Sequence, residues 1–148
     1  WSREQVVMES GDLIGAVRAS MALPGIFRPE TKDDRVLVDG GCVNPVPFDL
    51  LDNCDVTIGI DVLGEREAEP GELPNLFDAM FQTYQIMEES IIRAKLAKSP
   101  PSIFLSPEIS GIRVLDFHKA HSVFEQANLS RQQLKEQLQR LLDDSQHA

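Results

Sequence analysis

The stretch Val38-Asp39-Gly40-Gly41-Cys42-Val43-Asn44-Pro45-Val46-Pro47 decides the fold of this chain. It follows the run Arg35–Val38, which we expect to form a short buried strand. Asp39 would then lie at the C-terminal end of a parallel strand, where open α/β sheets bind their ligands. Gly40 and Gly41 let the backbone turn sharply and let another group approach the carboxylate. Taken alone, the motif is more typical of an Asp-Gly turn with a solvated side chain.

A second motif, Ala19-Ser20-Met21-Ala22-Leu23-Pro24-Gly25-Ile26-Phe27-Arg28-Pro29, stands upstream of the first. Together with Asp39-Gly40-Gly41 and Asn44-Pro45-Val46-Pro47, it resembles the C-terminal half of the patatin-like phospholipase catalytic domain. That family carries Ala-Ser/Thr-x-Ala-x-Pro-x-x-Phe-x-Pro, a strand, and Asp-Gly-Gly or Asp-Gly-Ala, in this order. The resemblance continues through Val56–Val62 and, more faintly, through Leu115-Asp116-Phe117.

The resemblance implies a lipid acyl hydrolase, a phospholipase or esterase, in which a serine and an aspartate form a dyad without histidine. Asp39 is then the catalytic residue, which takes the serine proton as general base and returns it to the leaving group. Gly40, Gly41 and Asn44 would support the loop. The Asn44 amide either orients the loop or belongs to an ordinary turn, and the sequence leaves both open. This chemistry needs no metal ion and no organic cofactor.

The family's nucleophile and its oxyanion loop both lie N-terminal to the Asp-Gly-Gly motif. Residues 1–148 contain no Gly-x-Ser-x-Gly, no Gly-Gly precedes Gly40, and the chain begins at Trp1. We therefore expect a C-terminal portion of a patatin-like catalytic domain, inactive alone, whose partner is the missing N-terminal half of that domain. Ser20 is not expected to be the nucleophile, because it lies in a predicted helix rather than on a strained turn.

The composition limits the class of partner. The chain is 42% hydrophobic and 26% charged, as globular proteins are. Its formal net charge of −10 disfavours nucleic acid and gives no attraction to anionic membranes. No apolar run is long enough for a transmembrane segment. We expect a lipid or ester substrate, a cytoplasmic or membrane-peripheral location, and a homo-oligomer if a sheet edge is uncovered.

Other candidate residues have structural explanations. Cys42 and Cys54 lack metal or redox spacing, so we expect buried reduced thiols rather than a disulfide. His118 and His121 stand three apart on a predicted helix, but no cysteine or third histidine is near, which favours a surface helix over a zinc site. Asp61 ends a predicted strand and is interpreted as structural. Phe27 is expected to belong to the core rather than to an acyl-binding wall.

Apolar periodicity predicts an α/β fold with a mainly parallel sheet and flanking helices, as a partial patatin-like hydrolase domain. Residues 1–63 form the catalytic-Asp segment, 64–74 a linker loop, and 75–145 a C-terminal helical segment with one short strand. The predicted strands are Gln5–Glu9, Arg35–Val38, Val56–Leu63 and Ile103–Leu105. We expect the second and third of these to be buried on both faces. The predicted helices are Asp12–Ala22, Phe48–Leu51, Asn75–Leu96, His118–Leu129 and Ser130–Leu142. The helix Asn75–Leu96 carries an apolar stripe at three-four spacing, formed by Phe77, Phe81, Tyr84, Met87 or Glu88, Ile91 and Lys95.

Two other functions remain open from the sequence. One is a catalytically dead binding or regulatory module that keeps a partner surface, through the helices between Asn75 and Leu142. The other is a stand-alone α/β domain of unrelated function. An upstream Gly-x-Ser-x-Gly after a strand would favour the enzyme, and a replaced serine would favour the module.

Overall fold

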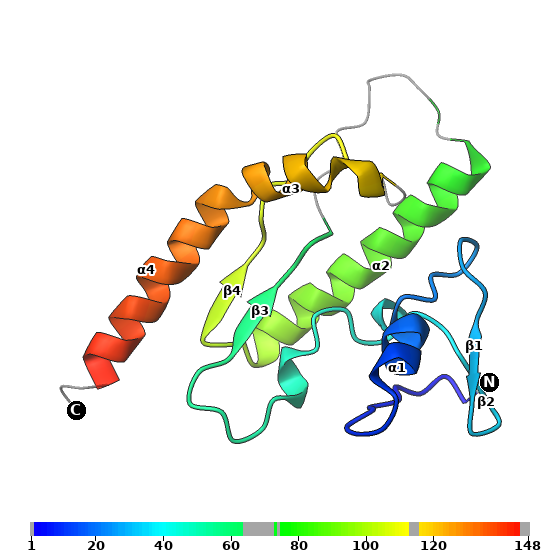
Figure 1. Cartoon of the computed structure of the whole chain (residues 1–148), viewed down its shortest axis with the longest axis horizontal. Helices are drawn as coiled ribbons and strands as arrows, with labels where there is room; N and C mark the ends of the chain where they lie inside the picture. The colour runs from blue at the N-terminus through cyan, green and yellow to red at the C-terminus, as the bar shows by residue number, and fades with distance from the viewer. Residues whose placement is uncertain (1, 64–72, 74, 113–115, 146–148) are drawn as a thin grey trace. The chain divides into compact units, whose positions relative to one another are not determined.

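The structure is a computed structural model that describes residues 2–63, 73, 75–112 and 116–145. Its contacts divide the chain into two compact units, Trp1–Pro47 with Asn75–Ala97, and Phe48–Pro74 with Lys98–Ala148. The predicted linker, residues 64–74, lies outside the described residues except for Leu73. The helices and strands in chain order are α1 (Leu13–Ser20), β1 (Glu30–Lys32), β2 (Arg35–Leu37), β3 (Ile58–Ile60), α2 (Leu76–Lys98), β4 (Ile103–Leu105), α3 (Ala120–Gln126) and α4 (Asn128–Ser145) (Figure 1).

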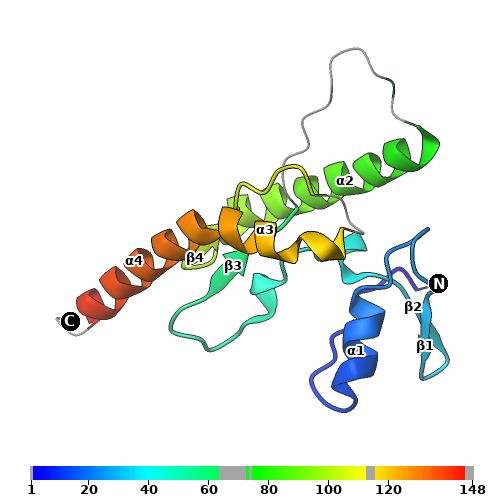
Figure 2. The ribbon, with the colours of Figure 1, turned by 45° about the horizontal axis from the view of Figure 1, so that its top comes forward.

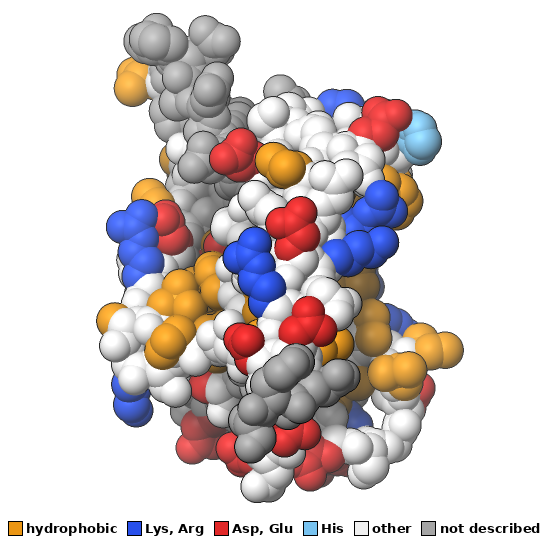
Figure 3. All heavy atoms as spheres, turned by 90° about the vertical axis from the view of Figure 1, so that its left-hand side faces the viewer, with side chains coloured by type: hydrophobic (Ala, Val, Ile, Leu, Met, Phe, Trp, Pro, Cys, Tyr) orange, Lys and Arg blue, Asp and Glu red, His pale blue; other side chains and the backbone are white. Residues whose placement is uncertain are grey.

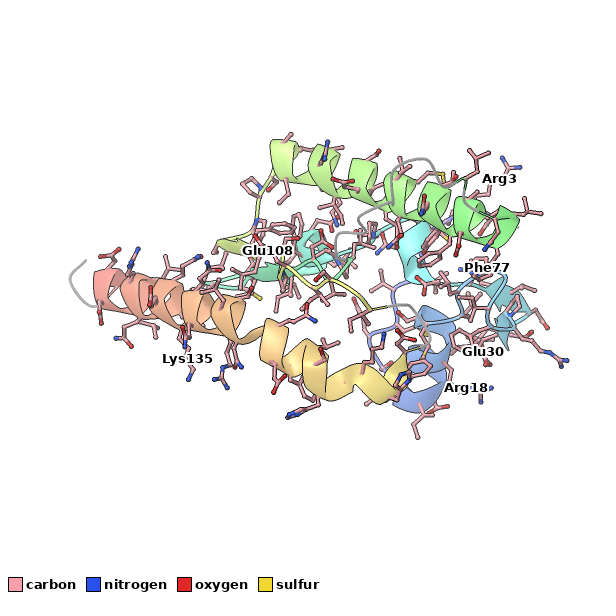
Figure 4. The ribbon with its side chains drawn as sticks, turned by 90° about the horizontal axis from the view of Figure 1, so that it is seen from above. Arg3, Arg18, Glu30, Phe77, Glu108 and Lys135 are labelled. Carbon is pink, nitrogen blue, oxygen red and sulfur yellow. The ribbon has the colours of Figure 1, made fainter. Side chains whose placement is uncertain are left out.

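The helix α1 opens the first unit and confirms the predicted helix Asp12–Ala22 in a shorter form. Asp12 is its N-cap, because the Asp12 carboxylate accepts the Ile14 backbone N–H at 3.0 Å. Near the other end of the helix, Arg18 forms a 2.7 Å salt bridge with Glu30 of β1, and Figure 4 shows the two side chains together. This pair ties the helix to the strand that follows it.

A tight hairpin joins β1 to β2. The strands are antiparallel with Lys32 opposite Arg35, so the loop has only two residues. Those residues, Asp33 and Asp34, have φ of 49° and 58°, the left-handed conformation that a type I′ turn requires at both positions. The strand before Asp39 is therefore present but antiparallel, and Val36 is 53% exposed. The prediction of a parallel strand buried on both faces is wrong here, because the turn folds the chain directly back.

The predicted strand Gln5–Glu9 is also wrong, because this segment joins no ladder. By contrast, the long helix α2 confirms the predicted helix Asn75–Leu96 and belongs to the first unit up to Ala97. Asn75 caps it by accepting the Asp78 backbone N–H at 2.9 Å. Phe77, at the start of the predicted stripe, is 51% exposed. Further along the helix, the covered side includes Glu88 and Ile92, which are 7% and 3% exposed.

The second unit contains the parallel pair of strands, β3 and β4, with Ile58 opposite Ile103. The α/β class is therefore confirmed, with a small sheet. Gly59 is buried beside two aromatic rings, since a Cβ built there would lie 3.0 Å from Phe104 and 3.2 Å from Phe48. These rings meet edge to face with centroids 6.4 Å apart. The sheet therefore packs tightly against the 3₁₀ turn Phe48–Leu50, which was predicted as a helical turn.

The strand β3 is shorter than the predicted strand Val56–Leu63. Asp61 ends it by accepting the Leu63 backbone N–H at 3.0 Å in a turn, which agrees with a structural role for this carboxylate. Ile60, the last paired residue of the strand, is 46% exposed, and Val62 beyond the ladder is 76% exposed. The expectation that both faces of this strand are covered is therefore wrong.

The last two helices follow each other with a change of direction (Figures 1 and 2). The break falls at Ala127 rather than between Leu129 and Ser130. Ser130 consequently lies inside α4 rather than at its start. α4 packs on β4, as expected for the C-terminal helices. Figure 3 shows hydrophobic side chains among charged ones on one face of the molecule.

Candidate active site

Asp39 lies where the two sequence motifs meet. It follows β2 after one residue and immediately precedes the 3₁₀ turn Gly40–Cys42. Its backbone N–H donates to the carbonyl oxygen of Ala22 at 3.1 Å. Ala22 belongs to the upstream Ala-Ser-x-Ala motif and is only 2% exposed. The structure therefore joins the two motifs through a buried backbone contact.

One oxygen of the Asp39 carboxylate is held from two directions. Oδ1 accepts the Gly41 backbone N–H at 2.7 Å and the Tyr84 hydroxyl at 3.2 Å. The first bond is local and caps the 3₁₀ turn, whereas the second comes from α2, 45 residues along the chain. Within the described part of the chain, no hydrogen bond reaches the other oxygen, Oδ2. The carboxylate is thus anchored on one side and available on the other.

A glycine is required at position 41 because other side chains approach its Cα closely, and not because its backbone angles need a glycine. A Cβ built on it would lie 2.6 Å from the Tyr84 hydroxyl oxygen and 3.0 Å from Asp39 Oδ1, and it would overlap Glu88 Oε1. Gly40 is different, since its nearest neighbour would be the Ser20 hydroxyl oxygen at 4.0 Å. The second glycine of the motif therefore makes room for α2 against the Asp39 loop.

Negative charge surrounds the Tyr84 hydroxyl. Burial raises the pKa of Tyr84, and the charges of Glu88 and Asp39 raise it further. Tyr84 therefore keeps its proton and acts as a hydrogen-bond donor. Burial also raises the pKa of the Cys42 thiol, although its hydrogen bond with Tyr84 opposes this. Cys42 is half-buried and Cys54 is exposed, so the expectation that both thiols are buried is wrong, whereas both are free thiols as expected.

Asn44 connects the loop after Asp39 to two other segments. The residue is 8% exposed, and its Nδ2 donates to Gln5 Oε1 at 3.3 Å. Its Oδ1 accepts a hydrogen bond from the Lys95 ammonium group of α2. The same ammonium group donates to the Val46 carbonyl oxygen at 2.7 Å. These contacts hold the loop between the N-terminal segment and α2, which an ordinary turn residue would not do.

Sequence reasoning missed the polar residues that α2 brings to this loop. Tyr84, Glu88 and Lys95 were assigned to an apolar stripe, yet all three meet the segment from Asp39 to Val46. A signal was present, because three polar side chains recur at helical spacing within a stripe that should be apolar.

Four other candidate residues lie in ordinary surroundings, with no feature of a functional site around them among the described residues. Ser20 is exposed at the last position of α1, which is not a strained turn. Phe27 is 39% exposed, so the expectation of a core position is wrong. His118 is exposed, and His121 Nε2 lies 3.3 Å from Glu125 Oε1 on the surface of α3. Among the described residues, no group of three His, Cys, Asp or Glu side chains could hold a metal ion. No helix in this part of the chain is long and apolar enough to cross a membrane.

Comparison with known proteins agrees with the sequence motifs. Residues 2–52 match the family model described as patatin-like phospholipase. An uncharacterised NTE family protein of Mycobacterium tuberculosis is 33% identical over 101 residues, which cover 63% of this chain and 28% of that protein. A second NTE family protein of this organism is 26% identical over 150 residues, covering 86% of this chain and 26% of its own length.

A mouse relative, patatin-like phospholipase domain-containing protein 7, is 30% identical over 148 residues, which cover 80% of this chain and 11% of that protein. The chain spans about a quarter of the length of the mycobacterial relatives that it matches. The segment of this chain that matches the family model, residues 2–52, contains both motifs and the whole Asp39 loop. By these matches, the chain is similar to the patatin-like phospholipase family, and residues 2–52 match the model of that family.

Proposed function

We propose that this chain supplies the catalytic aspartate of a serine–aspartate dyad in a lipid acyl hydrolase, a phospholipase or carboxylic ester hydrolase. Similarity to the patatin-like phospholipase family supports hydrolysis of lipids. One observation carries the assignment to Asp39. Its carboxylate is fixed through Oδ1 by Gly41 and Tyr84, while Oδ2 receives no hydrogen bond from the described residues. A general base needs an anchored carboxylate with one oxygen available to the substrate side.

The nucleophile in this proposal is a serine outside residues 1–148, in Gly-x-Ser-x-Gly. As the serine Oγ forms a bond to the ester carbonyl carbon, its proton passes to Asp39 Oδ2. When the ester C–O bond breaks, the same proton passes to the oxygen of the leaving alcohol. Asp39 then takes a proton from water, whose oxygen attacks the acyl-serine, and this proton returns to the serine Oγ as the acid leaves.

The surroundings of Asp39 suit an ester with an apolar acyl chain. Val38 and Val46 are half-buried and Val43 is 41% exposed, so apolar side chains stand on both sides of the carboxylate in the sequence. The substrate class that we propose is therefore acyl esters of phospholipids or related lipids. Residues 1–148 alone should not hydrolyse such esters, since Ser20 is the last residue of a regular helix and does not lie on the strained turn that exposes a nucleophile.

Replacement of Asp39 in the full-length protein that contains this chain tests the proposal. Asp39→Asn keeps the shape of the side chain and an acceptor for Gly41 and Tyr84, but it cannot take the serine proton. We expect kcat for a p-nitrophenyl ester to fall by roughly 10²–10⁴-fold, the usual contribution of a positioned acid-base group.

Asp34→Asn is the matched control. It makes the same chemical change in an exposed turn, where asparagine tolerates the φ of 58° as well as aspartate does. This variant should keep kcat within about twofold, in the range of a neutral surface change. Full esterase activity in a folded Asp39→Asn protein would show that Asp39 is not the base.

A further inference from the structure

Tyr84 reaches the Asp39 carboxylate from outside the loop that carries it. Its hydroxyl lies 3.2 Å from Oδ1, the oxygen that also accepts the Gly41 N–H at 2.7 Å. The ring of Tyr84 stacks beside Phe81 of the same helix, with centroids 6.5 Å apart and planes inclined by 27°. The phenol is therefore held by its own helix and does not depend on the loop for its position.

We propose that Tyr84 is the positioning residue for Asp39 and that it makes Oδ2 the oxygen that exchanges the proton. This inference rests on the proposed function. The Gly41 N–H is part of the same short turn as Asp39, so this bond alone moves with the loop. A second donor from α2 fixes the carboxylate relative to a long helix. An oxygen that accepts two hydrogen bonds is a poorer proton acceptor than one that accepts none, which directs the proton to Oδ2.

The state of the Tyr84 hydroxyl suits this role. Three titratable groups face it, namely Asp39, Glu88 and Cys42. Burial and the two carboxylates raise the pKa of Tyr84, so the phenol stays neutral and donates across the pH range of an esterase assay. The Glu88 carboxylate lies near the phenol, since a Cβ built on Gly41 would overlap Glu88 Oε1 and lie 2.6 Å from the Tyr84 hydroxyl oxygen.

The test removes the hydroxyl alone, in the full-length protein and with a p-nitrophenyl ester as substrate. Tyr84→Phe keeps the ring that stacks on Phe81. We expect kcat to fall about tenfold and KM to stay within about twofold, because the lost contact acts on the base and not on the substrate. Ser90→Ala is the matched control, since it deletes an exposed hydroxyl that donates to the Ile86 carbonyl oxygen of the same helix at 2.8 Å. It should leave both parameters unchanged.

Two further variants separate positioning from folding. In the Asp39→Asn background, Tyr84→Phe should lower the residual rate by less than about twofold, because the base that it positions no longer acts. 4-Aminophenylalanine in place of Tyr84 should restore most of the lost kcat, since its amino group donates from the same place. If Tyr84→Phe does not fold, 4-fluorophenylalanine takes its place in both backgrounds, since its fluorine occupies the position of the hydroxyl but donates no hydrogen bond.

The possible results separate a failure of this inference from a failure of the proposed function. Loss of activity in Asp39→Asn with unchanged kcat in Tyr84→Phe would overturn the inference and leave the proposed function standing. An equal loss from Tyr84→Phe in both backgrounds would mean that Tyr84 acts through the fold, which also overturns the inference. Full activity in Asp39→Asn, or no hydrolysis by the unsubstituted protein, would overturn the proposed function and this inference with it.

Discussion

The two glycines after Asp39 should differ sharply in their tolerance of alanine. Neither has a left-handed φ, so an alanine would not be strained by its backbone at either position. At Gly40 the added methyl group would meet only the Ser20 hydroxyl oxygen, at 4.0 Å. At Gly41 it would meet Tyr84 at 2.6 Å and Asp39 at 3.0 Å and would overlap Glu88. Gly40→Ala and Gly41→Ala therefore form a matched pair of variants within one motif.

The cost at Gly41 follows from what must move. The Glu88 carboxylate ends a flexible side chain but lies in a site that is 7% exposed, and such overpacking costs about 1–3 kcal/mol. The Tyr84 hydroxyl sits at the end of a rigid ring, so Tyr84 must withdraw from Asp39. A hydrogen bond to a charged group contributes about 1.5–3 kcal/mol, and the lower end applies to this part-buried pair. We therefore expect Gly41→Ala to lower the free energy of unfolding by about 2.5–4.5 kcal/mol.

Urea unfolding followed by circular dichroism at 222 nm measures this difference. With a slope of about 2 kcal/mol per molar urea, Gly41→Ala should lower the midpoint by about 1–2 M. Gly40→Ala should stay within about 0.5 kcal/mol of the parent chain. Because both variants restrict the unfolded chain equally, their difference isolates the clash. Equal midpoints for the two variants would refute the close approach of α2 to Gly41.

Two other predictions concern the contacts around the loop. Lys95→Met removes the donors to Asn44 and to the Val46 carbonyl oxygen, so it should lower the free energy of unfolding by about 1–3 kcal/mol. Lys98→Met, at the exposed end of the helix, should lower it by less than about 0.5 kcal/mol, and equal urea midpoints for the two variants would contradict the Lys95 contacts. Iodoacetamide at pH 8 should label exposed Cys54 at least about tenfold faster than Cys42, because burial raises the pKa of Cys42 and keeps it a thiol. Mass spectrometry of the labelled peptides measures the two rates, and faster labelling of Cys42 would show that the Asp39 loop is open.

Local patterns were sufficient to predict the elements that depend on nearby residues. The helices α1 and α2 and the short strand Ile103–Leu105 all follow from signals within one segment. The direction of β2 could not be predicted in the same way. It depends on two aspartates in the left-handed conformation, which aspartate adopts only occasionally. Without that turn, an apolar run before Asp-Gly-Gly is equally consistent with a parallel strand.

The same distinction between local and distant contacts applies to the candidate site. Asp39, Gly41 and Asn44 were found because the motif lies in one continuous stretch. Tyr84 and Lys95 were not assigned to it, because their partners are 45 and 51 residues away in sequence. Periodicity can tell which face of a helix is covered, but it does not tell what covers it. A polar residue on the covered face of a helix indicates that polar groups, and not an apolar core, lie opposite it.

The position of Asp39 depends on the number of residues in the turn between β1 and β2. Side chains alternate between the faces of a strand, so a slip of one residue in the pairing of Lys32 with Arg35 would turn every later side chain of the strand to the opposite face. Asp39 would then be carried away from Ala22 and from Tyr84. One residue inserted beside Asp33 would convert the turn into a three-residue loop, which favours a bulge and a different register. An evolving sequence could therefore exchange residues in this turn far more easily than it could lengthen it.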